Sequence, residues 1–207
     1  MLPLIIAIAG GTGSGKSFLS DRIIESIRDI RGHVIEIDSY YKDLSALPME
    51  QRESTNFDHP DSFEFELLHQ HIEMIKVGDD VKVPIYNYKT HTRTKDHVAI
   101  KGTDFIIING IMGLQDEALR SSFDLSIFID IDSDIRLSRR IKRDMRYRKR
   151  TLNSIINQYL ESVKIMHDRF VQPTMEYADM VLNDTGKTEI DSICTKIKLM
   201  YDSYSKK

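Results

Sequence analysis

Short runs of apolar residues alternate along this chain with longer segments whose apolar residues recur at helical spacing. The apolar runs have the length of buried parallel strands and occupy 4–9, 34–37, 105–108 and 125–131, with 180–182 as a weaker fifth. Leu19, Ile23 and Ile27 recur every four residues and predict a helix over 16–30 with one apolar face. Further helices are predicted over 63–77, 134–147, 152–170 and 188–203. This order predicts an α/β fold with helices on both faces of a mostly parallel sheet.

The segment 79–101 departs from this pattern. Val81, Val83 and Ile85 alternate with other residues, a polar stretch follows over 89–93, and 98–100 is apolar again. This pattern predicts a β-hairpin inserted outside the parallel core. Insertions of this kind lie at loop ends, where ligand sites concentrate, so we expect the hairpin to contact a substrate.

Length and charge exclude several other classes of protein. The 207 residues suit one domain over 1–207, and 29 Lys and Arg against 32 Asp and Glu give a net charge of −3. This balance gives no indication of a nucleic acid or an anionic membrane as partner. No run approaches the roughly 20 apolar residues of a membrane span, and the N-terminal run lacks the basic residues of a signal peptide. The single cysteine, Cys194, excludes an internal disulfide, so we expect a cytoplasmic protein.

A glycine-rich segment between the first strand and the first helix matches G-x-x-x-x-G-K-[ST]. Its glycines let backbone N–H groups curl around phosphate oxygens, the lysine can reach the β- and γ-phosphates, and the serine can ligate Mg²⁺. A glycine-rich turn that binds nothing is the alternative, but the strand and helix on either side favour a P-loop NTPase-type fold. The predicted nucleotide contacts are Gly10, Gly11, Thr12, Gly13, Ser14, Gly15, Lys16 and Ser17.

The chain lacks the [NT]-K-x-D segment by which GTPases recognise guanine, and it is too short to carry a motor module. A small-molecule kinase that uses ATP (or GTP) and Mg²⁺ is therefore the favoured class. Asp38 follows the second predicted strand, where it could orient a substrate hydroxyl near the γ-phosphate and accept its proton. An aspartate that merely caps a turn is the alternative for this position.

Several segments strongly resemble the uridine kinase (uridine–cytidine kinase) family in order and spacing, from the P-loop to about Asp179. They are 38–41 (DSYY), 56–63 (NFDHPDSF), 84–88 (PIYNY), 91–93 (HTR), 132–144 (DSDIRLSRRIKRD) and 158–159 (QY). The block at 56–61 is the most specific of them. The resemblance implies a pyrimidine ribonucleoside as substrate and a homo-oligomeric protein.

The resemblance also implies roles for single residues. Asp38 resembles the general base that also belongs to the magnesium environment, and Asp58 resembles the carboxylate that binds the ribose 2′- and 3′-hydroxyls. Contacts with the base and the walls around it are implied for Tyr86, His91, Phe57, Tyr41 and Tyr88. His91 also suits this role chemically, because a neutral imidazole has one donor and one acceptor. Taken alone, His91 would be interpreted as a solvated loop histidine.

Between 136 and 150 the chain has nine basic residues and one acidic residue, Asp144. Arg136, Arg140 and Arg143 share one helical face. A solvated charged face or a nucleic-acid stripe is conceivable, but lid arginines that neutralise a transferring phosphoryl group make better use of this charge. The resemblance implies that Arg140 and Arg143 contact phosphate. It further places a lid at about 143–158, with Arg148 near the nucleotide and Arg150 and Gln158 near the substrate.

Three positions depart from the family pattern. Asn109 replaces a glutamate that helps to hold the metal, Lys149 replaces the glycine of an Arg-Gly-Arg turn, and 183–186 replaces a Pro-Arg-Gly-type segment beside the adenine. Ser17, Asp38 and Asn109 remain as the expected metal environment. Because Asn109 keeps an oxygen but lacks the charge, we expect Asn109→Glu to lower the Mg²⁺ requirement, unless neighbouring carboxylates already fill this role. A phosphoribulokinase- or pantothenate kinase-like enzyme and a weakly catalytic nucleotide-binding module remain the alternative functions.

Overall fold

Five parallel strands form the central sheet in the computed structural model, which describes residues 2–205. Their order across the sheet is β2-β5-β1-β6-β7, and every neighbouring pair is parallel. The strands are β1 (Leu4–Gly10), β2 (Gly32–Glu36), β5 (Phe105–Asn109), β6 (Leu125–Ile129) and β7 (Met180–Leu182). The predicted parallel sheet, including its weak fifth strand, is confirmed.

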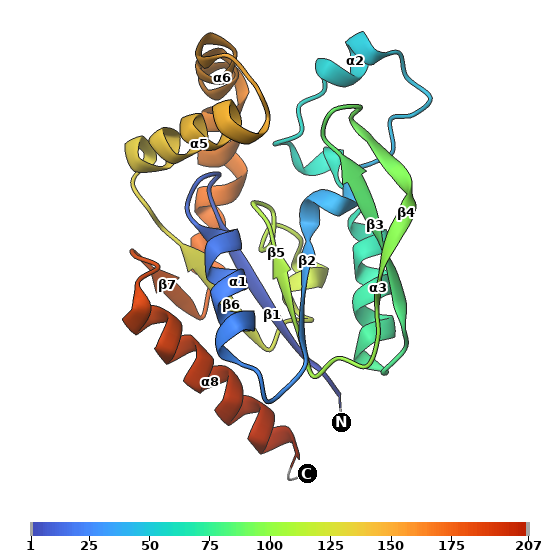
Figure 1. Cartoon of the computed structure of the whole chain (residues 1–207), viewed down its shortest axis with the longest axis vertical. Helices are drawn as coiled ribbons and strands as arrows, with labels where there is room; N and C mark the ends of the chain where they lie inside the picture. Colours follow the sequence, from blue (N-terminus) through green and yellow to red (C-terminus); the bar gives the residue numbers. More distant parts are fainter. Residues whose placement is uncertain (1, 206–207) are drawn as a thin grey trace.

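Helices cover both faces of this sheet, as predicted (Figure 1). Leu4, Ile6 and Ile8 of β1 lie in one core cluster with apolar residues of α1 (Lys16–Ser26) and α8 (Lys187–Ser205). Ile5, Ala7 and Ala9 belong to a second cluster, which contains apolar residues of α3 (Phe65–Lys76) and of the hairpin. The period of two along a strand therefore sends alternate residues of β1 into two separate cores. Ile27 stays in the first cluster although α1, predicted to reach residue 30, ends at Ser26.

Besides these covering helices, residues 2–205 contain five further α-helices and five irregular helical segments. The α-helices are α2 (Met49–Glu53), α4 (Glu117–Arg120), α5 (Ser133–Tyr147), α6 (Leu152–Gln158) and α7 (Lys164–Met166). Three 3₁₀ segments (Ile37–Tyr40, Pro60–Ser62 and Gln172–Tyr177) and two π segments (Tyr159–Val163 and His167–Val171) complete the set. The single helix predicted over 152–170 is thus a helical run with π turns, which are frequent near functional sites. No helix between residues 2 and 205 has the length and apolar character needed to cross a membrane.

The predicted hairpin is formed by β3 (Val81–Asn87) and β4 (Thr92–Ile100), which pair antiparallel as a separate two-stranded sheet. The alternation proposed from sequence is wrong at one point. Val81 and Val83 are buried, but the next buried residue is Tyr86 and not Ile85. The pairing shifts register between Pro84 and Tyr86, and this irregularity turns the tyrosine inward.

Asp38, which follows β2, is separated from the P-loop, which follows β1, by one strand of the sheet, although β1 and β2 are consecutive in the chain. β5 lies between β1 and β2, and β2 ends at Glu36, so Asp38 lies in the 3₁₀ segment Ile37–Tyr40. Asn109 is in register with Ile8 on one side and Glu36 on the other. The carboxyl ends of β1, β5 and β2 therefore meet at one edge of the sheet, where ligands bind in open α/β folds.

Candidate active site

The glycine loop curls between the end of β1 and the start of α1. Gly10, Gly13 and Gly15 have positive φ angles of 137°, 78° and 103°, and a Cβ atom at Gly13 would collide with the carbonyl oxygen of Arg136. The Lys16 ammonium donates to the carbonyl oxygens of Gly10 and Gly11 at 2.9 and 3.1 Å. Burial lowers the pKa of Lys16 to about 8, against the opposing effects of Asp38 and Glu36. A helix N-terminus, the backbone N–H groups of a glycine loop and an amine are the groups that commonly bind phosphate in proteins.

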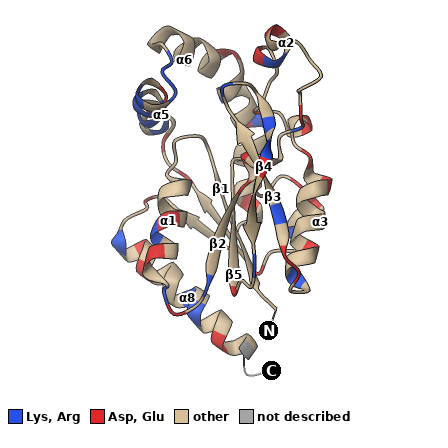
Figure 2. Cartoon of the chain, turned by 45° about the vertical axis from the view of Figure 1, so that its right-hand side comes forward, with Lys and Arg blue, Asp and Glu red and all other residues tan. Residues whose placement is uncertain are grey.

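Helix α5 packs its charged face against this loop. Arg136 and Arg140 are 5% and 6% exposed, whereas Ile135 and Met145 on the same helix are more than 40% exposed. Arg140 donates to the Thr12 hydroxyl at 3.1 Å. Figure 2 shows the basic residues concentrated along α5 and the turn that follows it. The helix thus directs Arg140 toward the glycine loop.

Asp144 is the centre of the lid and was missed as a site residue. It is completely buried, and its two carboxylate oxygens lie within 4 Å of four arginine side chains. The Nε atom of Arg143 donates to Oδ1 at 2.8 Å. The other three contacts are 3.7 Å to Arg140, 3.7 Å to Arg148 and 3.8 Å to Arg150. Gln158 joins the same network, because its amide oxygen accepts from both Arg140 and Arg150.

Lys149 has a φ angle of 56°, in the left-handed region that favours glycine. We expect Lys149→Gly to raise the free energy of unfolding by about 0.5–1 kcal/mol, because glycine removes the Cβ strain at this position. Lys149→Ala is the matched control, since it removes the same side chain and keeps the strain. Urea denaturation of both variants measures the difference, and equal shifts would contradict this explanation.

Asp38 lies where the sheet edge meets the hairpin. The Tyr88 hydroxyl donates to its Oδ2 atom at 2.9 Å, and the Arg148 guanidinium lies 4.7 Å from the centre of the Tyr88 ring. Desolvation by the surrounding protein, followed by the Asp38 charge, raises the pKa of the partly exposed Tyr88, so the phenol keeps its proton. Hairpin, lid and the segment after β2 therefore meet at this carboxylate.

Ser17, Glu36 and Asn109 form a polar cluster beside the P-loop. Asn109 Nδ2 donates to a Glu36 carboxylate oxygen at 2.7 Å and to the Ser17 hydroxyl at 3.2 Å. Asn109 is fully buried, and its Oδ1 atom has no hydrogen-bond partner among the described residues. Glu36 is open to the cleft on one side, but desolvation by surrounding protein, followed by the charge of Asp38, raises its pKa to about 7. Its register with Asn109 was the signal that sequence reasoning missed.

The oxygen atoms of Ser17, Glu36 and Asn109 fit a magnesium ion that is bound together with a nucleotide better than a metal ion that is bound by protein side chains alone. A hydroxyl, a carboxylate and an unpaired amide oxygen are hard oxygen ligands, which Mg²⁺ prefers. Within residues 2–205 no group of three or more His, Cys, Asp or Glu side chains is placed to hold a metal ion. Magnesium in kinases commonly uses few protein ligands together with phosphate and water, so the two observations agree.

Aromatic side chains form the wall of the cleft beneath the hairpin. The rings of Phe57 and His91 stack with centroids 5.0 Å apart and an interplanar angle of 14°. Tyr86 contacts Tyr88 edge-on at 5.3 Å and Tyr41 at 5.0 Å. Tyr41 is only 6% exposed, so it supports the wall from behind. The Tyr86 hydroxyl is buried with no hydrogen-bond partner in the described part of the chain.

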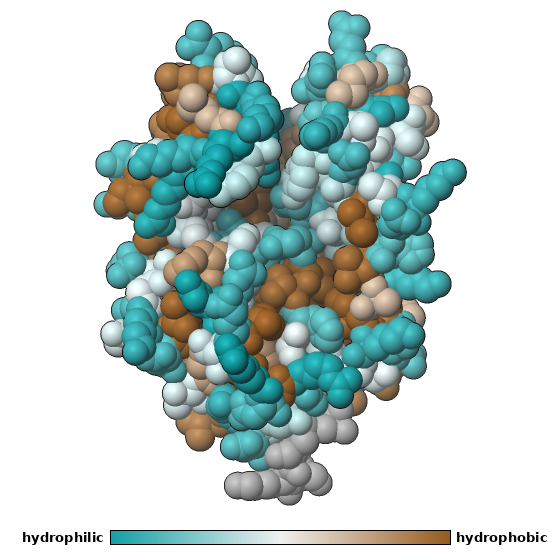
Figure 3. Space-filling model, viewed as in Figure 1, coloured by the Kyte–Doolittle hydropathy of each residue, from teal (hydrophilic) through white to brown (hydrophobic). Residues whose placement is uncertain are grey.

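Asp58 lies between the phosphate side and the aromatic side of the cleft. Burial raises its pKa, Arg140 opposes this rise, and the charge of Asp38 adds to it. In the space-filling view, a cleft opens at the top of the molecule between the lobe that carries α5 and α6 and the lobe that carries α2 and the tip of the hairpin (Figure 3). Asp58 is thus close to Asp38, to Lys16 of the P-loop and to Arg140 of α5.

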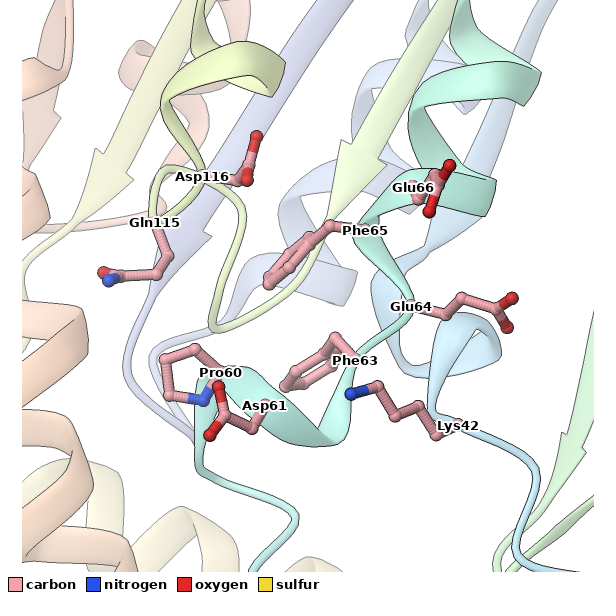
Figure 4. A pocket seen from close by; sticks show the side chains of 9 residues that line it. All are labelled: Lys42, Pro60, Asp61, Phe63, Glu64, Phe65, Glu66, Gln115 and Asp116. Atoms are coloured by element: carbon pink, nitrogen blue, oxygen red, sulfur yellow. The ribbon is translucent and has the colours of Figure 1, made fainter.

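A second hollow, of about 420 Å³, lies beside the start of α3 (Figure 4). It is lined by Lys42, Pro60, Asp61, Phe63, Glu64, Phe65, Glu66, Gln115 and Asp116. Four of these residues are acidic and one is a lysine, so the hollow disfavours a triphosphate. None of the predicted site residues lines it.

Comparisons with known proteins agree with this geometry. A family model described as "Phosphoribulokinase / Uridine kinase family" matches residues 5–191. A uridine kinase of Clostridium novyi (strain NT) is 48% identical over 200 residues, which cover 96% of each chain. A uridine kinase of Halalkalibacterium halodurans is 42% identical, covering 97% of this chain and 96% of its own. Phosphoribulokinase from Rhodobacter spheroides shares the fold, with a TM-score of 0.63, 14% identity and coverage of 89% of this chain and 73% of that one.

Proposed function

Because this chain belongs to the phosphoribulokinase/uridine kinase family, we propose that it transfers the γ-phosphoryl group of ATP to the 5′-hydroxyl of uridine or cytidine. The observation that carries this proposal is the position of Asp38. It lies at the same sheet edge as the P-loop and is joined by Tyr88 to the aromatic wall of the cleft. A nucleoside bound against that wall would present its hydroxyl between the carboxylate and the γ-phosphate.

The nucleotide half of the cleft is built to hold and neutralise phosphate. The P-loop N–H groups, Lys16 and the α1 N-terminus would bind the triphosphate, and Arg140, Arg143 and Arg148 would cover it from the lid. Ser17 and Asp38 are the residues that would hold Mg²⁺ and its waters, with Asn109 and Glu36 hydrogen-bonded beside Ser17. When bound, Mg²⁺ neutralises charge on the phosphate oxygens.

The nucleoside half offers groups that match each part of a pyrimidine ribonucleoside. The Phe57–His91 stack and the Tyr86 ring provide apolar surface for the base. The unpaired Tyr86 hydroxyl and the His91 ring provide polar contacts, and His91 can face either a carbonyl or an amino group. The Asp58 carboxylate suits two vicinal ribose hydroxyls.

In the reaction, a bond forms between the 5′-oxygen of the nucleoside and the γ-phosphorus of ATP. At the same time, the bond between the γ-phosphorus and the β,γ-bridging oxygen breaks. Asp38 orients the hydroxyl and accepts its proton, and ADP keeps the bridging oxygen. Tyr88 donates to one carboxylate oxygen of Asp38, which would fix the orientation of the carboxylate and leave its other oxygen to the substrate hydroxyl. Phosphoryl transfer depends chiefly on positioning and on charge stabilisation, and these are the contributions that the carboxylate and the lid arginines make.

A substrate panel tests this proposal. ADP release coupled to NADH oxidation is measured with uridine, cytidine, adenosine and pantothenate at saturating MgATP. We expect turnover with at least one pyrimidine nucleoside and background rates with the other two compounds. Preferential turnover of pantothenate would favour the pantothenate-kinase alternative, and no stimulation by any compound would favour a nucleotide-binding module.

The position of Asp58 predicts discrimination between ribose and deoxyribose. We expect kcat/KM for uridine to exceed that for 2′-deoxyuridine by roughly 10- to 150-fold, because the missing hydroxyl leaves a desolvated charged acceptor unpaired. In Asp58→Ala this ratio should fall toward one. Asp61→Ala is the control, since its side chain is 88% exposed on the same loop. Equal activity of the parent protein on both nucleosides would remove Asp58 from this role.

A further inference from the structure

Three polar side chains from three different elements meet beside the P-loop. Ser17 lies in the first turn of α1, Glu36 is the last residue of β2, and Asn109 is the last residue of β5. The Asn109 amide donates to Glu36 at 2.7 Å and to Ser17 at 3.2 Å, and the Ser17 hydroxyl lies 3.4 Å from the same Glu36 oxygen. Asn109 therefore links the other two.

The three residues differ in charge and in access. Glu36 is the only charged member, and it is open to the cleft, whereas Asn109 is fully buried behind it. The Asn109 Oδ1 atom is a buried oxygen that has no hydrogen-bond partner among residues 2–205, and such an atom in a native protein commonly meets a water or an ion. The charged groups that face Glu36 from other elements are Asp38 and Lys16. Lys16 donates to two P-loop carbonyl oxygens and not to Glu36 in the described hydrogen bonds.

We propose that Glu36 provides anionic charge for the Mg²⁺ of bound MgATP and that Asn109 is the neutral residue that positions Glu36 beside Ser17. This inference rests on the proposed function, because it assumes that MgATP occupies the cleft. It also reverses the result expected from sequence alone for Asn109→Glu. A carboxylate at 109 would lie beside Glu36 and add a like charge, which disfavours ionisation of both groups.

Nucleotide binding without any nucleoside tests the proposal independently of catalysis. Isothermal titration calorimetry gives the Kd of the non-hydrolysable analogue AMPPNP with Mg²⁺ and with EDTA, and the ratio of the two measures the coupling of metal to nucleotide. In Glu36→Gln we expect this coupling to fall by about tenfold, within the usual range of coupling between two ligands. The metal-free affinity should be unchanged or tighter, because a negative charge near the phosphates has been removed. Glu25→Gln, an exposed substitution on α1, should leave both values unchanged.

Variants that place a carboxylate at position 109 provide a second part of the experiment. Asn109→Glu alone should not increase the metal coupling above that of the parent protein. The double variant Glu36→Gln/Asn109→Glu has one carboxylate again, so it should recover at least part of the coupling lost in Glu36→Gln. Thermal unfolding of each variant establishes whether it is folded. If the variants at position 109 do not fold, the result for Glu36→Gln alone decides the proposal.

Two results would overturn the proposal. An unchanged coupling in Glu36→Gln would show that Glu36 does not act on the metal. Equal loss of affinity with and without Mg²⁺ would show that it only supports the structure. Failure of the proposed function would give a different result. A protein that binds MgAMPPNP with this coupling but phosphorylates no nucleoside would support the role of Glu36 and contradict the proposed substrate.

Discussion

Replacing Asp38 with asparagine should lower kcat for uridine by roughly 10²–10⁴, which is the usual contribution of a general base. The asparagine keeps the size of the side chain and an oxygen that can accept from Tyr88, so the local structure should persist. What it loses is the charge that orients the 5′-hydroxyl and receives its proton. We expect the KM for uridine to change little, because the base and the ribose are held by other residues.

Steady-state kinetics by ADP release measures this effect. Asp43→Asn is the matched control, because Asp43 is an exposed aspartate five residues later whose carboxylate accepts from the backbone N–H and the hydroxyl of Ser45. Near-parental turnover in Asp38→Asn would remove Asp38 from the chemical step. A large rise in KM at constant kcat would instead assign Asp38 to substrate binding.

Removal of the Asp144 carboxylate should cost about 3–5 kcal/mol of unfolding free energy in Asp144→Ala. Asp144 is completely buried beside four arginines, and loss of one partner leaves buried cations uncompensated. Arg140 is the most affected, because its side chain is only 7% exposed. Urea denaturation monitored by circular dichroism gives the free energies of unfolding.

Asp168→Ala provides the comparison for Asp144→Ala. Its ion pair with Lys164, at 2.6 Å, lies on an exposed helical face, where such pairs contribute less than about 1 kcal/mol. A loss of less than 1 kcal/mol in Asp144→Ala as well would show that the lid arginines do not need this carboxylate.

The sequence predicted the positions of the helices and strands along the chain far better than it predicted which of these elements lie next to one another. Apolar runs and helical spacing are local properties, so the strands, α1 and the hairpin were recognised to within a few residues. Strand order depends on crossovers, and the insertion of β5 between β1 and β2 leaves no local trace. The same limit explains Tyr86, whose burial follows from an irregular pairing with β4 that no pattern within β3 shows.

The two site residues that sequence reasoning missed, Glu36 and Asp144, were hidden for related reasons. Glu36 gains its significance from its register with Asn109 across two strands that are distant in the chain. Asp144 lies in a strongly basic segment, and such a segment usually forms a solvated face. Here α5 buries charged residues and exposes apolar ones, because the buried face meets a phosphate-binding loop instead of an apolar core. The roles of the individual site residues, ATP as donor and the homo-oligomeric state stay predictions.

Identification of the product tests the central claim most directly. The protein is incubated with MgATP and either uridine or 5′-deoxyuridine, and the phosphorus-containing products are identified by ³¹P NMR. We predict that uridine gives uridine 5′-monophosphate and ADP in equal amounts and that 5′-deoxyuridine gives no nucleoside monophosphate. Equal ADP formation with both nucleosides, or none above the nucleoside-free rate with uridine, would contradict transfer to the 5′-hydroxyl.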